Sequence, residues 1–297
     1  MSNPQRASEV SVGAEREVGQ ERVRRLEEVA RQIRIDIIQM TYEAGPERKA
    51  HPGGALSAAD IVAALYFDIM RIDPARPKWP DRDRFILSKG HACPVLYAAL
   101  ACKGYFGKDA YRSLRRVDGM LQGHPDMKNT PGVDMTTGSL GHGLSAGVGM
   151  ALAARIDHKD FRVFVLLGDG ECQEGLVWEA AMAAAHYRLD NLVAIVDANG
   201  LQSCDSVEAT ITLNPFAPKW TAFGWRVIEI DGHRMEEVVS SLDHAVRPEG
   251  RPTVIVAKTV KGKGVSFMEN DNSWHQRAPD RKQYEQALAE LGVKGGS

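Results

Sequence analysis

Five short hydrophobic runs, separated by helix-like segments, constrain the fold of this chain more than any other sequence feature. Most of them show little alternation of apolar and polar residues, which is typical of strands that are covered on both faces. Such strands, joined by helices, form parallel sheets with a helical layer on each side. We therefore expect a doubly wound α/β fold with a mostly parallel sheet. The runs cover residues 84–87, 163–167, 192–196, 225–230 and 253–258.

The segments before and between these runs have helical periodicity. Apolar residues recur in steps of three and four over residues 21–44, and Gly45-Pro46 then ends the pattern, which predicts a helix with one buried face. A second helix is expected to begin at Ser57, a residue type that favours the N-cap. Further helices are predicted over residues 94–102, 144–155 and 175–187, with one more between the last two strands.

Composition places few limits on the architecture but excludes several functions. Hydrophobic residues make up 43% of the 297 residues, enough for a substantial core. The 37 Lys and Arg residues balance 39 Asp and Glu residues, so no net charge favours nucleic acid or an anionic membrane. The apolar runs are far shorter than the about 20 residues that span a bilayer, and the first residues lack a secretory signal. We expect a cytoplasmic protein.

The four cysteines are scattered and form no C-x-x-C motif. This spacing argues against a zinc knuckle, a redox pair or a disulfide framework. Cys172 follows the strongest motif of the chain, and we interpret it as a packed thiol. Residues 1–18 are polar and aperiodic, so a disordered N-terminal arm is expected there, followed by a single domain over residues 19–297.

The strand at residues 163–167 runs directly into Gly168-Asp169-Gly170, and the next strand ends in Asp197-Ala198-Asn199-Gly200-Leu201. Ligands of open parallel sheets bind at the carboxyl ends of the strands. If the two strands are neighbours, Asp169 and Asn199 lie at the same edge. Their oxygens and the Leu201 carbonyl suit Mg²⁺ or Ca²⁺, and the two glycines allow a phosphate to approach the backbone closely.

Each motif taken alone is also a good turn sequence, because Gly, Asp and Asn favour turns. The joint pattern is more specific, since each motif ends a hydrophobic strand and Asp169 and Asn199 are 30 residues apart. That spacing corresponds to about one βαβ unit. It favours a shared diphosphate and metal site over two unrelated turns.

The chain resembles the transketolase family in several further sequence motifs, which occur in the family's order over about residues 20–290. The Gly-Asp-Gly and Asn spacing itself is similar to the motif of thiamine diphosphate enzymes. Two positions depart from the common family pattern: Ala198 stands where Asn is frequent, and His142 where Gln is common. The motifs are Lys49–Gly54, Arg84–Ala92, Gly123–Pro125, Thr136–Gly143, Lys258–Gly264 and Trp274-His275.

The resemblance implies thiamine diphosphate as cofactor, with Mg²⁺ (or Ca²⁺) held by Asp169, Asn199 and Leu201. By the same resemblance, the cofactor-binding residues include Gly138, Ser139, Leu140, Gly168, Asp169, Gly170, Glu174, Asn199, His91 and His275.

Four histidines lie in the motifs that resemble the family: His51, His91, His124 and His275. Read singly, each is more typical of a structural or surface histidine. The resemblance implies instead that His91 and His275 lie near the diphosphate and the reacting centre, and that His51 and His124 contact the hydroxyls of the sugar donor. Imidazole suits this work because its pKa is near neutrality.

Glu174 begins the helix at residues 175–187, where a carboxylate interacts favourably with the helix dipole. The resemblance implies a second role, in which the matching Glu supports the cofactor-activating acid of a partner domain. In the family that domain follows in the same chain or forms a separate subunit. The resemblance here is to the N-terminal subunit of a split transketolase. It implies a heterotetramer, with two copies of this chain and two of a separate C-terminal subunit.

Three other functions stay open at this point. The alpha subunit of a 2-oxo-acid dehydrogenase shares the Gly-Asp-Gly site, but the His-Pro-Gly and Ser-Lys-Gly-His-Ala words argue against it. A non-catalytic transketolase-like binding protein is disfavoured by the intact Asp169, Asn199 and histidines. A nicotinamide enzyme is least favoured, since residues 141–147 lack the G-x-G-x-x-G spacing. The donor and acceptor sugars are not predicted.

Overall fold

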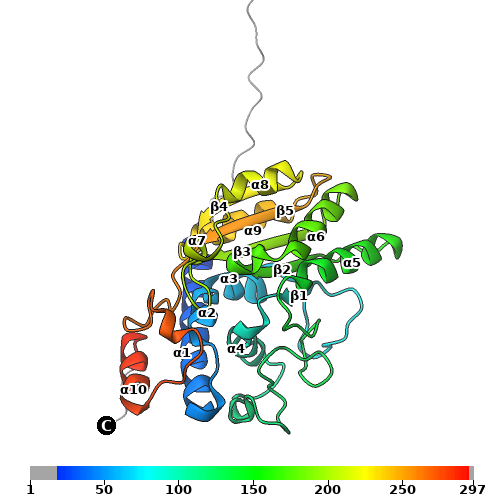
Figure 1. Ribbon diagram of the computed structural model, residues 1–297. Coiled ribbons are helices and arrows are strands. Elements are labelled where there is room, and N and C mark those ends of the chain that lie inside the picture. Colours follow the sequence, from blue (N-terminus) through cyan, green and yellow to red (C-terminus); the bar gives the residue numbers. More distant parts are fainter. Residues whose placement is uncertain (1–18, 294–297) are drawn as a thin grey trace, which may run out of the picture.

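A five-stranded parallel sheet forms the centre of the computed structural model (Figure 1), which describes residues 19–293. The arm predicted at residues 1–18 lies outside the described residues. The strand order is β1-β2-β3-β5-β4, and every neighbouring pair is parallel. All five predicted runs are confirmed as strands. They are β1 (Arg84–Leu87), β2 (Val163–Gly168), β3 (Leu192–Ala198), β4 (Arg226–Asp231) and β5 (Thr253–Lys258).

Alternate residues of the central strands point into two separate hydrophobic cores. In β2, Phe164 and Leu166 join one core, whereas Val163, Val165 and Leu167 join the other. Helices therefore cover both faces, and the predicted doubly wound fold is confirmed. The first core contains residues of α1 (Gln20–Ala44), α2 (Pro52–Ser57), α3 (Ala59–Ala64), α4 (Cys93–Lys103) and α9 (Met235–Ala245); the second contains residues of α5 (His142–Ile156), α6 (Gly175–His186) and α8 (Phe216–Ala222).

The helix predicted to begin at Ser57 is present as α3, but it begins at Ala59, and the predicted N-cap role of Ser57 is wrong. Helix α2 begins at Pro52, whose fixed backbone suits the first turn, and Ser57 is its last residue. The Ser57 hydroxyl caps no helix; it donates hydrogen bonds to the Gly54 carbonyl and to the buried Asp197 carboxylate. The side chain is thus used in the core, below the carboxyl edge of the sheet.

Helix α10 (Arg281–Glu290) was not predicted, although its start carries a readable signal. Asp280 and Gln283 form a capping box, in which each side chain accepts a hydrogen bond from the other's backbone. The helix packs on α1, where Tyr284 stacks on Tyr42 at 4.1 Å between ring centroids. The remaining short elements are α7 (Val207–Thr210), a π-helical turn (Leu65–Ile69) and the 3₁₀ turns Pro46–Arg48, Gly90–Ala92, Lys108–Ser113, Gly170–Gln173 and Asn272–Trp274.

The carboxyl ends of all five strands lie at one edge of the sheet, because every pair is parallel. The loops that leave β1, β2, β3 and β5 there carry most of the candidate site residues. Among residues 19–293, no helix is both long enough and apolar enough to cross a membrane.

Candidate active site

The two motifs at the strand tips touch each other. Strands β2 and β3 pair with Gly168 opposite Asp197. The Gly200 amide donates a 2.6 Å hydrogen bond to one oxygen of Asp169, and the Gly170 amide donates a 2.8 Å bond to the other. The Asn199 side-chain oxygen accepts from the Leu201 amide at 3.1 Å. Asp169 therefore joins the loop that contains Asn199 and Leu201, as expected for neighbouring strands.

The donor set at these tips fits a hard divalent cation. Burial raises the pKa of Asp169 to about 6, against the hydrogen bonds from Gly200 and Gly170, and the nearby Asp197 charge adds to the rise. A cation at Asp169 would favour its ionised form. The side-chain oxygen of Gln202 is buried next to Gly170 and has no hydrogen-bond partner among the described residues. This orphaned oxygen indicates space for a polar ligand.

Within residues 19–293, no group of three or more His, Cys, Asp or Glu side chains could hold a metal ion. The candidate ligands at the strand tips differ from such groups, because they combine one carboxylate, one amide and one backbone carbonyl. All are oxygens, which suits Mg²⁺ or Ca²⁺ better than zinc.

Three of the four predicted histidines form a cluster, although they come from distant parts of the sequence. The ring centroids are 5.2 Å apart for His51 and His91, 5.2 Å for His51 and His275, and 5.1 Å for His91 and His275. His51 precedes α2, His91 lies in the turn after β1, and His275 follows the last 3₁₀ turn. The fold thus brings together residues that no local spacing connects.

Burial keeps these imidazoles neutral. It lowers the pKa of His51 to about 3 and the pKa of His275 to about 4, with a further contribution from neighbouring positive groups. The pKa of His91 is also held well below its ordinary value, for the same reasons. The buried Nδ1 of His51 has no hydrogen-bond partner among the described residues. At neutral pH, the cluster therefore offers uncharged imidazole rings whose nitrogens can donate or accept hydrogen bonds.

His124 lies beside the cofactor loop predicted at Gly138–Leu140. A Cβ at Gly138 would come within 3.6 Å of the His124 ring. His124 is exposed as a residue, yet the partial burial of its ring lowers its pKa. The positive charge of Arg115 lowers that pKa further. The His124 charge in turn lowers the pKa of His51. His124 and His51 are therefore electrostatically coupled.

Glu174 occupies the N-cap position of α6, but its side chain makes no capping hydrogen bond. The side chain is exposed. A Cβ at Gly141 would lie 2.8 Å from the Glu174 Cβ, so only glycine fits where the predicted cofactor loop meets this helix. The Glu174 carboxylate is therefore free to face solvent or another chain.

Two buried lysines at the site were not singled out from the sequence. Lys89 is ion-paired with Asp197 and donates to the Gly54 carbonyl at 2.8 Å. Lys261 donates to the Gln202 carbonyl at 2.9 Å and to His275 Nδ1 at 3.2 Å. Lys261 thus links the candidate metal loop to the histidine cluster, and burial lowers its pKa to about 8.

Asp197 lies beneath the site and forms the ion pair with Lys89. It is fully buried and accepts hydrogen bonds from Ser57, Lys89 and Thr259. Burial alone would raise its pKa, but the Lys89 charge and these hydrogen bonds keep it below the usual range. In the sequence, the only signal for the two buried lysines was that Lys89 and Lys261 lie within the Ser-Lys-Gly-His and Lys-Gly-Lys-Gly motifs.

Arg115 is a further cation that the sequence did not reveal. It has a positive φ of 58°, and its positive charge lowers the pKa of both His51 and His124. The flanking Arg112 and Arg116 are ion-paired with Glu43 and Asp118, whereas Arg115 takes part in no ion pair within the described part of the chain. Its charge acts on the histidines instead.

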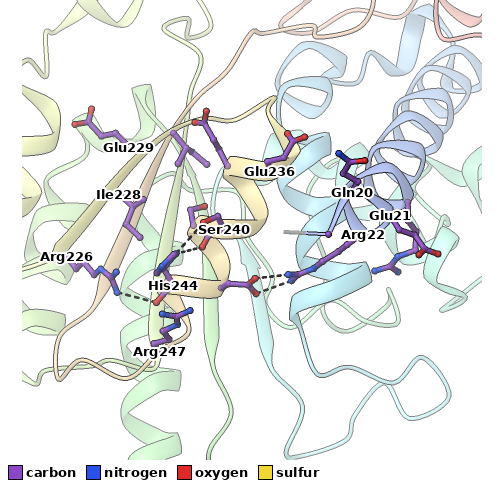
Figure 2. Close-up of a pocket in the computed structure, with 16 residues that line it drawn as sticks. Gln20, Glu21, Arg22, Arg226, Ile228, Glu229, Glu236, Ser240, His244 and Arg247 are labelled. Atoms are coloured by element: carbon purple, nitrogen blue, oxygen red, sulfur yellow. Dashed lines mark hydrogen bonds and ion pairs between the residues drawn. The ribbon is translucent and has the colours of Figure 1, made fainter. Parts of the chain in front are cut away.

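A cavity of about 1930 Å³ lies elsewhere, between the start of α1, strand β4 and helix α9 (Figure 2). Two of its arginines already have carboxylate partners: Arg22 is ion-paired with Asp68 and Asp243, and Arg226 with Glu249. His244 donates from Nδ1 to the Ser240 carbonyl, which is typical of a structural histidine. Polar side chains from several loops come together at the strand tips and not at this cavity, so we place the site at the strand tips.

Comparisons with known proteins identify the family to which the chain is similar. Residues 24–296 match the family described as transketolase, thiamine diphosphate binding domain. The 6-deoxy-6-sulfo-D-fructose transketolase subunit SqwG of Clostridium sp. (strain MSTE9) is 48% identical over 253 residues, which cover 85% of this chain and 92% of that protein. A subunit of the apulose-4-phosphate transketolase of Phocaeicola vulgatus is 43% identical over 272 residues, which cover 92% of this chain and 95% of that one.

Longer transketolases match the same region. Human transketolase is 41% identical over 273 residues, and the match covers 92% of this chain but 43% of the human protein. The structure of transketolase from Leishmania mexicana superimposes with a TM-score of 0.82 at 31% identity, covering 90% of this chain and 41% of that one.

Proposed function

The chain belongs to the transketolase family, whose thiamine diphosphate-binding domain it forms, and from this premise we propose that it is one subunit of a split transketolase. Together with a separate C-terminal subunit, it transfers a two-carbon ketol unit from a ketose donor to an aldehyde acceptor. The observation that carries the proposal is the contact of Asp169 with the Asn199–Leu201 loop, linked through Lys261 to the neutral histidines.

The strand tips hold the cofactor in this proposal. Asp169, Asn199 and the Leu201 carbonyl bind the divalent ion, and the loops at Gly168–Gly170 and Gly138–Leu140 approach the diphosphate. Lys89 and Lys261 add positive charge next to them. When bound, thiamine diphosphate supplies an electron sink for breaking and forming a carbon–carbon bond beside a carbonyl.

The histidines orient the sugar and move protons. His51 and His124 hold donor hydroxyls, while His91 and His275 lie toward the diphosphate and the reacting centre. A neutral imidazole accepts the proton of a hydroxyl within hydrogen-bond reach. The negative charge of a bound diphosphate would raise the low pKa values of the cluster toward neutrality, which makes these imidazoles better bases in the loaded enzyme.

A partner protein is supported by an exposed apolar face on α5 and α6, which lie beside each other on one face of the sheet (Figure 1). Ile156, Met182 and Tyr187 are 75%, 53% and 50% exposed. Such a face on a folded chain is typical of a protein–protein interface. Glu174 lies at the other end of α6, at its N-cap. The partner in this proposal is the C-terminal transketolase subunit, in a heterotetramer with two copies of each chain.

The substrate in this proposal is an anionic ketose. Arg115 supports this, because its charge acts on the two histidines assigned to the donor. Two relatives are named for anionic sugars, one sulfonated and one phosphorylated.

Co-expression of the chain with the product of the neighbouring gene, followed by donor assays, tests this proposal. We expect ketol transfer from phosphorylated or sulfonated ketoses, dependent on thiamine diphosphate and a divalent ion, and no transfer when the two proteins are assayed separately. Turnover of pyruvate without turnover of ketoses would favour a 2-oxo-acid dehydrogenase component. If the complex binds no thiamine diphosphate in calorimetry, a non-catalytic binding protein would be favoured.

A further inference from the structure

Glu171, directly after the Gly-Asp-Gly motif, has a buried carboxylate that lies between three loops. Glu171 is only 3% exposed. One carboxylate oxygen accepts hydrogen bonds from the Ser88 hydroxyl at 2.5 Å and from the Gly141 amide at 2.9 Å. The other oxygen accepts from the Gly168 amide at 3.0 Å. Each bond reaches a different segment of the site.

These three segments are the ones that the proposed cofactor site requires. Ser88 precedes the turn that carries His91, Gly141 closes the loop at Gly138–Leu140, and Gly168 begins the loop of Asp169. A single carboxylate bonds to all three, so it is their common anchor.

The chemistry of the donors makes a carboxylate necessary. Backbone N–H groups of Gly141 and Gly168 can only donate, so both side-chain oxygens must accept. An amide in this place has one oxygen and one NH₂ group, and in either orientation its NH₂ group would face a backbone N–H. A buried donor without an acceptor is costly, so the loop that loses its bond would move away.

We infer that Glu171 is a positioning residue, whose carboxylate fixes the Gly138–Leu140 loop against the Gly168–Gly170 loop and so preforms the cradle for the diphosphate. The inference rests on the proposed function for the identity of the ligand. The close packing around the anchor agrees with it, since a Cβ at Gly143 would lie 2.3 Å from the Ser88 hydroxyl oxygen.

Hydrogen–deuterium exchange of the full chain tests the anchor without the cofactor. In Glu171→Gln, we expect the amides of peptides that cover residues 138–142 and 166–170 to exchange at least about tenfold faster than in the wild type. Peptides of α9 should exchange as before. The matched control is Glu236→Gln, an exposed carboxylate of α9. Accelerated exchange throughout the chain, or none in the two loops, would contradict the inference.

Calorimetry of Mg²⁺–thiamine diphosphate binding to the reconstituted complex gives the second readout. Removal of a positioning group of this kind typically weakens binding about 10- to 100-fold, and we expect that loss in Glu171→Gln. Ser88→Ala, which keeps the carboxylate and both backbone bonds, should lose a few-fold and serves if Glu171→Gln fails to fold. Binding as tight as in Glu236→Gln for both variants would overturn the inference. A wild-type complex that binds no cofactor would instead refute the proposed function, while the exchange experiment would still test the anchor.

Discussion

At the scale of single residues, the site depends on groups that stay uncharged because they are buried. His51 and His275 have pKa values near 3 and 4, and the pKa of His91 is also well below its ordinary value. An unfolded chain releases these imidazoles into water, where their pKa is about 6.5. The cluster therefore links the stability of the fold to pH.

Well above pH 6.5, the three histidines are neutral in both states and contribute no pH dependence. As the pH falls below that value, the unfolded chain binds protons that the folded chain does not, so stability decreases. We predict that the urea midpoint falls between pH 7 and pH 5. His275→Asn should reduce that fall, and His186→Asn, at an exposed position of α6, should leave it unchanged. An equal fall in all three proteins would contradict the assignment.

Residue patterns predicted the strand tips but not the charges that surround them. Asp169 and Asn199 could be read because each follows a hydrophobic strand, and parallel pairing brings such ends together. Lys89 and Lys261 could not, because a buried lysine is recognisable only by its tertiary partners. Ser57 was misread for a related reason: its hydroxyl bonds to Asp197, 140 residues away in sequence.

At the scale of elements, exposure distinguishes the outer face of α5 and α6 from the rest of the helical layer. A charge in the centre of an apolar interface has to be desolvated without a partner, which is costly. We predict that Ile156→Lys, at a 75% exposed position, weakens association with the partner protein by at least about tenfold. Size-exclusion chromatography and calorimetry of the mixed subunits measure this.

The matched control for that experiment is Val117→Lys, at an apolar residue that is also exposed and lies in the loop after the Lys108–Ser113 turn. It should leave association unchanged. Equal association of Ile156→Lys and the wild type would place the partner on another face of the molecule.

The elements themselves were predictable to different degrees. The five strands and the long helices α1, α5 and α6 follow from apolar runs and helical periodicity, which burial on the sheet confirms. Helix α8 was missed because its seven residues are too few to show helical periodicity. Pro218 lies in its first turn, where proline is tolerated. Its position is set by Trp220, which packs against Trp178 and Trp225.

At the scale of the whole molecule, one buried polar network joins helices to the sheet. Arg34 of α1 makes two hydrogen bonds to Asp60 of α3, at 3.0 and 2.5 Å. Asp60 also accepts from His233 Nδ1 at 2.7 Å, and His233 Nε2 accepts from the Val260 amide at 2.8 Å. The amide can only donate, so the His233 proton lies on Nδ1. The network ends next to Lys261 of the site.

Breaking this network should destabilise the whole domain. Asp60→Ala leaves the Arg34 guanidinium buried without its partner, and loss of one member of a buried pair costs about 3–5 kcal/mol. We predict a loss of that order in the free energy of unfolding, measured by urea denaturation with an unchanged slope. Asp118→Ala, which breaks the exposed pair with Arg116, should change it by less than about 1 kcal/mol. Equal effects would show that the buried network is not an anchor of the fold.

The most direct test of the account is the metal dependence of cofactor binding at the strand tips. In the reconstituted complex, calorimetry should show thiamine diphosphate binding with Mg²⁺ and little binding with EDTA. Asp169→Ala should weaken binding in Mg²⁺ by at least about 100-fold, while Asp205→Ala, at an exposed position of the adjoining loop, should bind as the wild type does. Unchanged binding in Asp169→Ala, or wild-type binding that does not depend on the metal ion, would contradict the proposed site.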